Sequence, residues 1–122
     1  MTKDYSKNYH DLRKSISKLG LKLPEVMSSF NTLHSASIAE GALSTKTKEL
    51  IALGIAITVR CDGCIAFHVH NALSSGATTQ EIIETVGVAV IMGGGPAVVY
   101  GSEALEALEQ FIVLEQNETE AQ

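Results

Sequence analysis

The spacing of apolar residues in the N-terminal part of the chain is that of amphipathic α-helices. Apolar side chains recur every three or four positions through residues 5–19 and again through residues 25–40. The first stripe consists of Tyr9, Leu12, Ile16 and Leu19, and the second of Val26, Phe30 and Leu33. Gly20 follows the first segment and Gly41 follows the second, as is common at helix ends. Pro24 precedes the second segment. The pattern therefore predicts two amphipathic helices.

The middle of the chain predicts two more helices of different character. Ser44 is a suitable N-cap for a helix that includes residues 48–59. This segment is apolar on nearly every face from residue 50 onward, so we expect neighbouring elements, including other subunits, to bury it. Residues 62–75 form a shorter helix that ends at Gly76. Its expected inward stripe is Ile65, Val69, Ala72 and Leu73.

Helix-start signals of two kinds open the last two predicted helices. Thr78 and Glu81 have the spacing of a capping box at the start of residues 81–92. Three glycines then interrupt the pattern, and Pro96 suits the first turn of a helix that reaches about Glu115. The expected apolar edge of this final helix consists of Leu105, Leu108 and Ile112.

Length and composition indicate one all-α domain, a compact bundle of five or six helices. The chain has 122 residues, of which 45% are hydrophobic, enough for one core but too few for two ordinary domains. The single domain spans residues 1–122, with an N-terminal helix within 1–22. Residues 116–122 lack large apolar side chains, so we expect this tail to fray.

Charge and hydropathy exclude several classes of function. The net charge is −5, with 14 acidic residues against 9 lysines and arginines, which argues against a nucleic-acid-binding protein. The N-terminus has charges but no apolar stretch behind them, so no secretory signal is indicated and we expect a cytoplasmic protein. The longest apolar run, residues 50–59, is far shorter than the ~20 residues that span a membrane.

The most informative stretch contains Cys61, Cys64 and His68. At positions i, i+3 and i+7 of a helix, these residues gather along one edge, which then carries two thiols and a base. A helix N-terminus stabilises a thiolate, the form that attacks a peroxide to give a sulfenic acid. A second, neighbouring thiol condenses with the sulfenic acid and forms a disulfide. His68, one turn beyond Cys64, is placed to accept and return the proton.

Glu49 and His70 are the other candidates near this motif. Glu49 precedes Cys61 by twelve residues, about 18 Å along a straight helix, so the chain must turn at residues 60–63 to bring it near His68. A zinc site made of both cysteines, His68 and His70 is a competing interpretation. Helical geometry disfavours it, because His70 points about 200° away from His68.

The series Glu49, Cys61, Cys64 and His68 resembles the active-site signature of the alkyl hydroperoxidase D-like group in the carboxymuconolactone decarboxylase superfamily. The similarity covers residues 23–111 and includes GALSTKTKELIALGIAI before the cysteines and GATTQEI after them. Gly63 stands where some members carry a histidine. The resemblance implies an all-helical fold and a homotrimer or homohexamer. We expect no cofactor and no metal.

By the same resemblance, Cys64 is the peroxidatic thiol and Cys61 the more accessible resolving thiol. His68 and Glu49 would form a proton relay to the cysteines, and a lipoyl or thioredoxin-like protein would supply reducing equivalents. The implied activity is thiol-dependent peroxide reduction. A non-enzymatic redox sensor or oligomeric binding protein using the same dithiol is the alternative. Lactone decarboxylation is disfavoured, since that branch of the superfamily does not use the cysteine pair.

Overall fold

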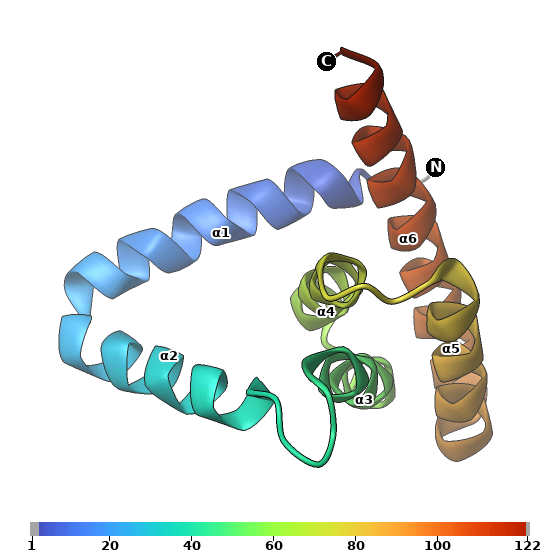
Figure 1. Cartoon of the computed structure of the whole chain (residues 1–122), viewed down its shortest axis with the longest axis horizontal. Helices are drawn as coiled ribbons and strands as arrows, with labels where there is room; N and C mark the ends of the chain where they lie inside the picture. Colours follow the sequence, from blue (N-terminus) through green and yellow to red (C-terminus); the bar gives the residue numbers. More distant parts are fainter. Residues whose placement is uncertain (1–2, 122) are drawn as a thin grey trace.

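The computed structural model describes residues 3–121, with the side chains of residues 3–117. This part of the chain forms six helices and no strand, which confirms the all-α prediction (Figure 1). The helices are α1 (Tyr5–Lys22), α2 (Pro24–Ile38), α3 (Thr45–Thr58), α4 (Asp62–Ser74), α5 (Thr79–Gly93) and α6 (Gly95–Ala121). Among these residues, no helix combines the length and apolar character that crossing a bilayer requires.

Predicted capping interactions fix the starts of α3 and α5. The backbone N–H of Thr47 donates to Ser44 Oγ at 3.1 Å, so Ser44 is the N-cap of α3. At α5, the N–H of Glu81 donates to Thr78 Oγ1 at 3.1 Å, and the N–H of Thr78 donates to Glu81 Oε1 at 2.8 Å. This reciprocal pair is the capping box that the sequence predicts.

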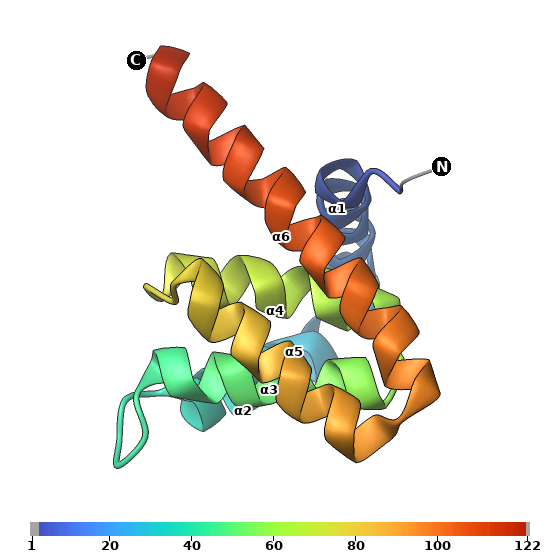
Figure 2. The same cartoon turned by 90° about the vertical axis from the view of Figure 1, so that its right-hand side faces the viewer.

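The hydrophobic core lies among α3, α4, α5 and α6, with α3 and α4 side by side beneath α6 (Figure 2). The largest fully buried apolar side chains come from all four helices: Leu53, Ile57, Ile65, Val69, Ile82 and Leu108. Burial of each contributes roughly 1.5–3 kcal/mol relative to exposure. Small residues let α5 and α6 approach, since a Cβ at Gly101 would lie 2.8 Å from Val86 Cγ1.

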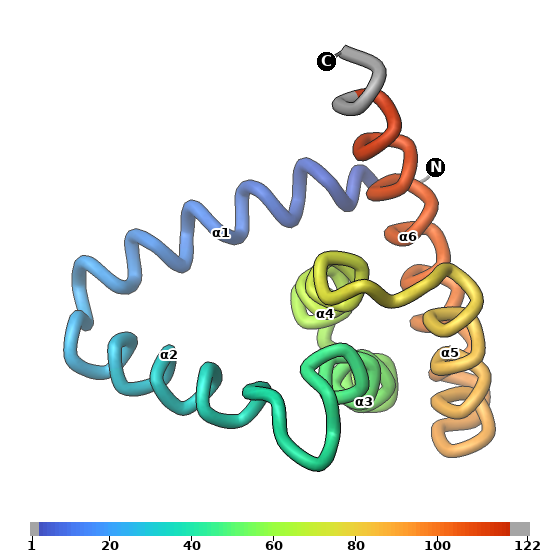
Figure 3. Tube along the Cα trace, viewed as in Figure 1, coloured from blue at the N-terminus to red at the C-terminus, as the bar shows by residue number. Residues whose placement is uncertain are grey.

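The first two helices form an arm that leaves this core. The N-terminal end of α1 packs on the core through Tyr5, which is 3% exposed, and through Tyr9. The chain then runs outward along α1, reverses at Leu23 and returns along α2 to the start of α3 (Figure 3). α2 contains no buried residue at all. Its amphipathic pattern is therefore not explained by packing within the chain.

Some predicted helix ends are wrong. α1 continues past Gly20 to Lys22, because a single glycine costs only about 1 kcal/mol inside a helix. α2 spans Pro24–Ile38 rather than residues 25–40, because Pro24 occupies its first turn. The last helix runs on to Ala121 rather than stopping near Glu115, since glutamate, glutamine and alanine are good helix formers. Part of the predicted frayed tail, Gln122, lies outside the described residues.

The buried edge of α6 also differs from the predicted one. Leu108 is buried as expected, but Leu105 is 40% exposed and Ile112 only partly buried. The residues that α6 buries are mostly small: Ala97, Gly101, Ala104, Ala107, Leu108 and Phe111. Close approach of α5 to α6 favours this small-residue edge, which counting only large apolar residues overlooks.

Candidate active site

A tight reversal joins α3 to α4 and brings the two ends of the motif together. Arg60 adopts a positive φ of 62°, an uncommon conformation for a residue other than glycine. The N–H of Arg60 donates to the carbonyl of Ile57 at 3.2 Å, and the N–H of Cys61 donates to the carbonyl of Ala56 at 3.0 Å. These two bonds form a Schellman motif, which ends α3. The predicted turn between Glu49 and Cys61 is therefore present.

The cysteines occupy the N-terminus of α4. Cys61 is the N-cap residue, and its Sγ accepts a hydrogen bond of 3.3 Å from the backbone N–H of Cys64. The two cysteines form a disulfide, with their Cα atoms 5.1 Å apart, and both are partly exposed. A sulfur in this position lies at the positive end of the helix dipole, which favours a thiolate once the disulfide is reduced.

His68 and Glu49 are in direct contact across the α3–α4 interface. His68 Nδ1 lies 2.8 Å from Glu49 Oε2, and Glu49 is buried, with 1% of its surface exposed. A carboxylate only accepts, so Nδ1 is the nitrogen that donates to ionised Glu49, and in the neutral imidazole Nε2 is the nitrogen that can accept a proton. His68 is one helical turn beyond Cys64 and keeps part of its surface exposed. The arrangement supplies an oriented base beside the dithiol.

The second oxygen of Glu49 is unusual. Oε1 is buried and has no hydrogen-bond partner among the described residues. A buried carboxylate oxygen without a donor is costly. Among the described residues, His68 is therefore the one hydrogen-bond partner of Glu49. The stability of the buried carboxylate thus depends on His68.

His70 does not belong to this cluster. Its Nδ1 lies 3.1 Å from the hydroxyl of Tyr9, and the two rings stack with centroids 4.5 Å apart. Phe111 of α6 contacts both rings edge-on. His70 thus anchors the base of the arm to α4 and α6, in agreement with the predicted direction of its side chain. Within the described residues, no three histidine, cysteine or acidic side chains are grouped closely enough to bind a metal.

The N-terminal segment covers one side of the cysteine turn. Lys3 Nζ lies 2.9 Å from Asp62 and 3.0 Å from Glu103, and these hydrogen bonds, with Asp62 first, raise the pKa of Lys3. Gln110 fixes the same segment, accepting from the N–H of Tyr5 at 2.7 Å and donating to the carbonyl of Lys3 at 2.6 Å. Burial, aided by nearby Glu103, raises the pKa of Tyr5 to about 12.

Leu12 also contacts the cysteine turn and was not predicted to lie there. A Cβ on Gly63 would come within 2.7 Å of Leu12 Cδ2, so α1 lies directly against Gly63, one of the two residues between the cysteines. The sequence carries no signal for this contact or for those of Lys3 and Gln110, because the partners are far apart along the chain. The candidate site therefore includes contacts beyond the four predicted residues, which are Glu49, Cys61, Cys64 and His68.

Comparison with known proteins identifies relatives over most of the chain. Residues 24–107 match the model of the carboxymuconolactone decarboxylase family. An uncharacterised protein of Cupriavidus necator is 35% identical over 105 residues, which cover 86% of this chain and 93% of that protein.

Solved structures extend the comparison. The crystal structure of a carboxymuconolactone decarboxylase family protein from Legionella pneumophila is 44% identical, with a TM-score of 0.85 over 88% of this chain and 96% of its own. A family member from Thermotoga maritima, for which a role in the antioxidative response has been suggested, is 29% identical, with a TM-score of 0.81 over 90% and 94% of the two chains. In sequence and in fold, this chain belongs to the carboxymuconolactone decarboxylase family.

Proposed function

We propose that the protein reduces peroxides by a thiol-dependent reaction at Cys64 and Cys61. The observation that carries the proposal is the pairing of a helix-capping dithiol with a histidine whose Nδ1 is held by a buried carboxylate. A disulfide needs only two neighbouring cysteines. The oriented base one turn away is the feature that favours catalysis over a passive redox pair.

The reaction begins from the reduced dithiol. Nε2 of His68 accepts the proton of the Cys64 thiol, and the thiolate attacks one peroxide oxygen. The O–O bond breaks, Cys64 becomes a sulfenic acid, and the leaving alkoxide takes the proton from His68 to depart as an alcohol, or as water from hydrogen peroxide. The Cys61 sulfur then attacks the Cys64 sulfur, water leaves, and the disulfide between them forms.

Glu49 acts on this sequence through His68. Its carboxylate fixes the imidazole with Nε2 free and stabilises the imidazolium that forms when the thiol proton is transferred. A dithiol reductant, either a lipoyl or a thioredoxin-like protein, closes the cycle by thiol–disulfide exchange and is itself oxidised to a disulfide. The antioxidative role suggested for the Thermotoga maritima relative supports this assignment.

Peroxide consumption with a lipoyl and with a thioredoxin-like reducing system tests the proposal. We expect sustained turnover by the wild type, none by Cys64→Ser, and a single turnover by Cys61→Ser. A redox sensor would instead consume one equivalent of peroxide per chain even with excess reductant. A lactone-decarboxylating enzyme would release CO₂ from its substrate in both serine variants, and this result would contradict the proposal.

A further inference from the structure

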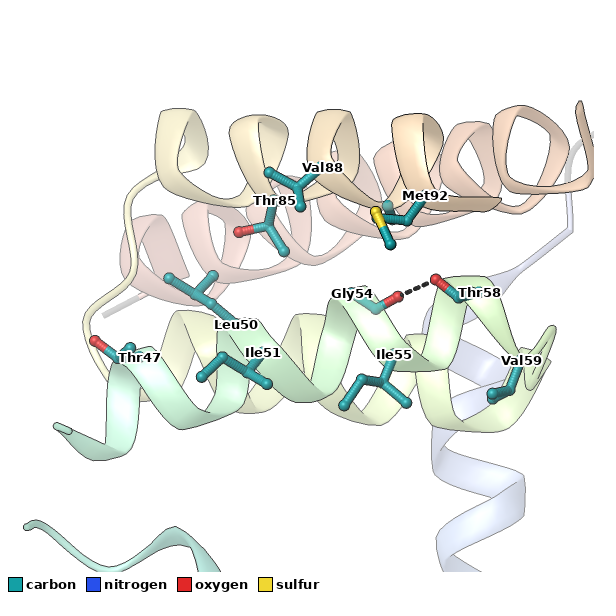
Figure 4. A pocket seen from close by; sticks show the side chains of 11 residues that line it. Thr47, Leu50, Ile51, Gly54, Ile55, Thr58, Val59, Thr85, Val88 and Met92 are labelled. Carbon is teal, nitrogen blue, oxygen red and sulfur yellow. Dashed lines mark hydrogen bonds between the residues drawn. The ribbon is translucent and has the colours of Figure 1, made fainter. Parts of the chain in front are cut away.

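Two hollows beside the helices of the candidate site differ in charge. The groove between α3 and α5 has a volume of about 530 Å³ and is lined by apolar residues and threonines (Figure 4). The hollow between α1 and α4, of about 310 Å³, includes the carboxylates of Asp11 and Asp62 in its lining. Asp62 and Gly63, which also lines this hollow, separate the two cysteines. Charges on the α1 side of α4 are therefore close to the dithiol.

Lys3 joins three parts of the chain at this point. Its Nζ lies 2.9 Å from Asp62 Oδ2 and 3.0 Å from Glu103 Oε1, so it connects the first residue of α4 to α6. Gln110 of α6 binds the backbone on both sides of Asp4, at the carbonyl of Lys3 and the N–H of Tyr5. The position of Lys3 therefore depends on backbone hydrogen bonds as well as on its ion pairs.

Ionisation of a cysteine adds a negative charge beside Asp62. The thiol gives up its proton, which His68 accepts in the proposed reaction, and the sulfur becomes negative. A like charge nearby opposes this change, whereas an opposite charge favours it. Asp62 lies in the first turn of α4, so its carboxylate also competes with the sulfur for the positive end of the helix dipole. A cation bound to Asp62 offsets both effects.

The other charged or titratable side chains around the cysteine turn come from each element packed against it. Among the described residues, they are Asp11 of α1, Glu49 of α3, Arg60 of the reversal, His68 of α4 and Glu103 of α6. Glu49 and His68 contact each other, and Asp11 pairs with Lys7 at 3.4 Å. Lys3 is the one cation that forms an ion pair with Asp62 in the described part of the chain.

We propose that Lys3 is a positioning residue for the dithiol, which holds the Asp62 carboxylate and offsets its charge so that the cysteines ionise more readily. The inference rests on the proposed function, because it concerns the thiolate that attacks the peroxide. Stabilising a thiolate stabilises the reduced protein, so the disulfide becomes easier to reduce. Without Lys3, we expect less thiolate at neutral pH and a disulfide that is harder to reduce.

Alkylation of the reduced protein by iodoacetamide measures the thiolate without any peroxide. We expect Lys3→Gln to react ~2- to 5-fold more slowly at pH 7, the range that partly exposed ion pairs permit. Lys3→Arg should react like the wild type. The rates of all variants should converge at a pH where the thiols are fully ionised, and the difference at pH 7 should shrink with added salt. Mass spectrometry identifies the cysteine that reacts.

Lys7→Gln is the matched control. Lys7 is an exposed lysine near the same end of the chain, but its ion pair is with Asp11, so its loss should leave the alkylation rate unchanged. Lys3 and Lys7 are both about half or more exposed, so circular dichroism of each variant should match that of the wild type.

A second substitution tests whether Lys3 acts through Asp62. In a chain that carries Asp62→Asn, Lys3→Gln should change the alkylation rate by less than about 1.5-fold, because the two residues are coupled. An equal effect with and without Asp62→Asn would overturn the proposal, and so would an unchanged rate in Lys3→Gln alone.

Equilibration with a fixed ratio of reduced to oxidised glutathione gives an independent measurement. The equilibrium constant for reduction of the disulfide should fall ~2- to 5-fold in Lys3→Gln and stay at the wild-type value in Lys7→Gln. A constant that is unchanged or higher in Lys3→Gln contradicts the proposal. Neither measurement uses peroxide turnover, so a failure of this inference is distinguishable from a failure of the proposed peroxidase activity.

Discussion

His68 and Glu49 are separated by nineteen positions in the sequence but are joined by a 2.8 Å hydrogen bond. The bond links the buried face of α3 to the edge of α4 that carries the cysteines. Because Glu49 is buried and its other oxygen has no partner among the described residues, loss of His68 would strand a carboxylate in the core. The pair therefore affects both proton transfer and stability. For each variant of the pair, the stability of the fold must be measured as well as the rate of peroxide reduction.

Replacing either member of this pair should slow peroxide reduction. Groups that transfer protons contribute about 10²–10⁴ in rate, so we expect His68→Ala to lose ~10² or more and Glu49→Gln to lose less, because the amide oxygen still accepts from Nδ1. Peroxide consumption under a constant reducing system measures the effect.

His70→Ala is the matched control for this prediction. His70 contacts Tyr9 rather than the cysteines, so its loss should leave the rate nearly unchanged. Circular dichroism must first establish that each variant keeps its fold. Unchanged kinetics in both His68→Ala and Glu49→Gln would refute the relay.

Peroxide treatment of the reduced protein should join Cys61 to Cys64 within one chain. Their proximity at the start of α4 favours intramolecular reaction over encounter with another subunit. Mass spectrometry of the intact chain should show the loss of two hydrogens, and peptide mapping should locate the bond. Covalent dimers, or a sulfinic acid as the main product, would argue against Cys61 as the resolving thiol.

Cys61→Ser should be more stable than Cys61→Ala by ~1 kcal/mol under reducing conditions. Both variants lack the disulfide, but serine is a strong N-cap and can accept from the N–H of Cys64 as the Cys61 sulfur does. Thermal or urea unfolding with excess reductant measures the difference. Equal stability would mean that capping at this position contributes little to α4.

Two glycine substitutions should change stability in opposite directions. Gly101→Ala places a Cβ 2.8 Å from Cγ1 of Val86, a stiff β-branched side chain, and should destabilise the protein by ~1–3 kcal/mol. Gly20→Ala meets no neighbouring atom and should stabilise α1 by ~0.5–1 kcal/mol. Urea unfolding compares the two, and a destabilising Gly20→Ala would indicate a contact at α1 that the single chain does not show.

The charge of Glu81 should stabilise the protein only at higher pH. Hydrogen bonds from the Thr78 backbone, followed by Lys46, lower the pKa of Glu81 in the folded state. A lowered folded pKa means that the stabilisation is present above the unfolded value, near 4.5, and disappears as the pH falls through the folded value. Glu81→Gln should therefore melt below the wild type at pH 7.

Repeating the melt at lower pH checks the sign of this effect. The difference in melting temperature between Glu81→Gln and the wild type should shrink as the pH falls below about 4.5. It should also shrink with added salt at pH 7, because both Glu81 and Lys46 are partly exposed. A difference independent of pH would assign the effect to packing rather than to charge.

Local chemistry explains why much of the fold could be predicted from the sequence. Ser44 and the Thr78–Glu81 pair mark helix starts through hydrogen bonds to residues three positions away. Such bonds depend little on the packing of the rest of the chain. The helical period likewise predicts one edge for Cys61, Cys64 and His68; in the structure Cys64 and His68 belong to α4, and Cys61 is its N-cap. Helix ends were predicted less well, because Gly20 weakens a helix without forcing it to stop and because the glutamate and glutamine residues after Leu114 favour its continuation.

The sequence predicts a turn at residues 60–63, but only the tertiary structure decided the geometry in which the parts of the candidate site meet. The reversal after α3 depends on a positive φ at Arg60, where no glycine signals it, and this turn sets Glu49 against His68. Lys3 and Leu12 reach the cysteine turn across more than fifty positions, and no local pattern encodes such contacts. Periodicity predicted the apolar stripe of α2 but not its exposure. Burial depends on which surfaces meet in space, whereas a helix depends mainly on residues within a few positions of one another.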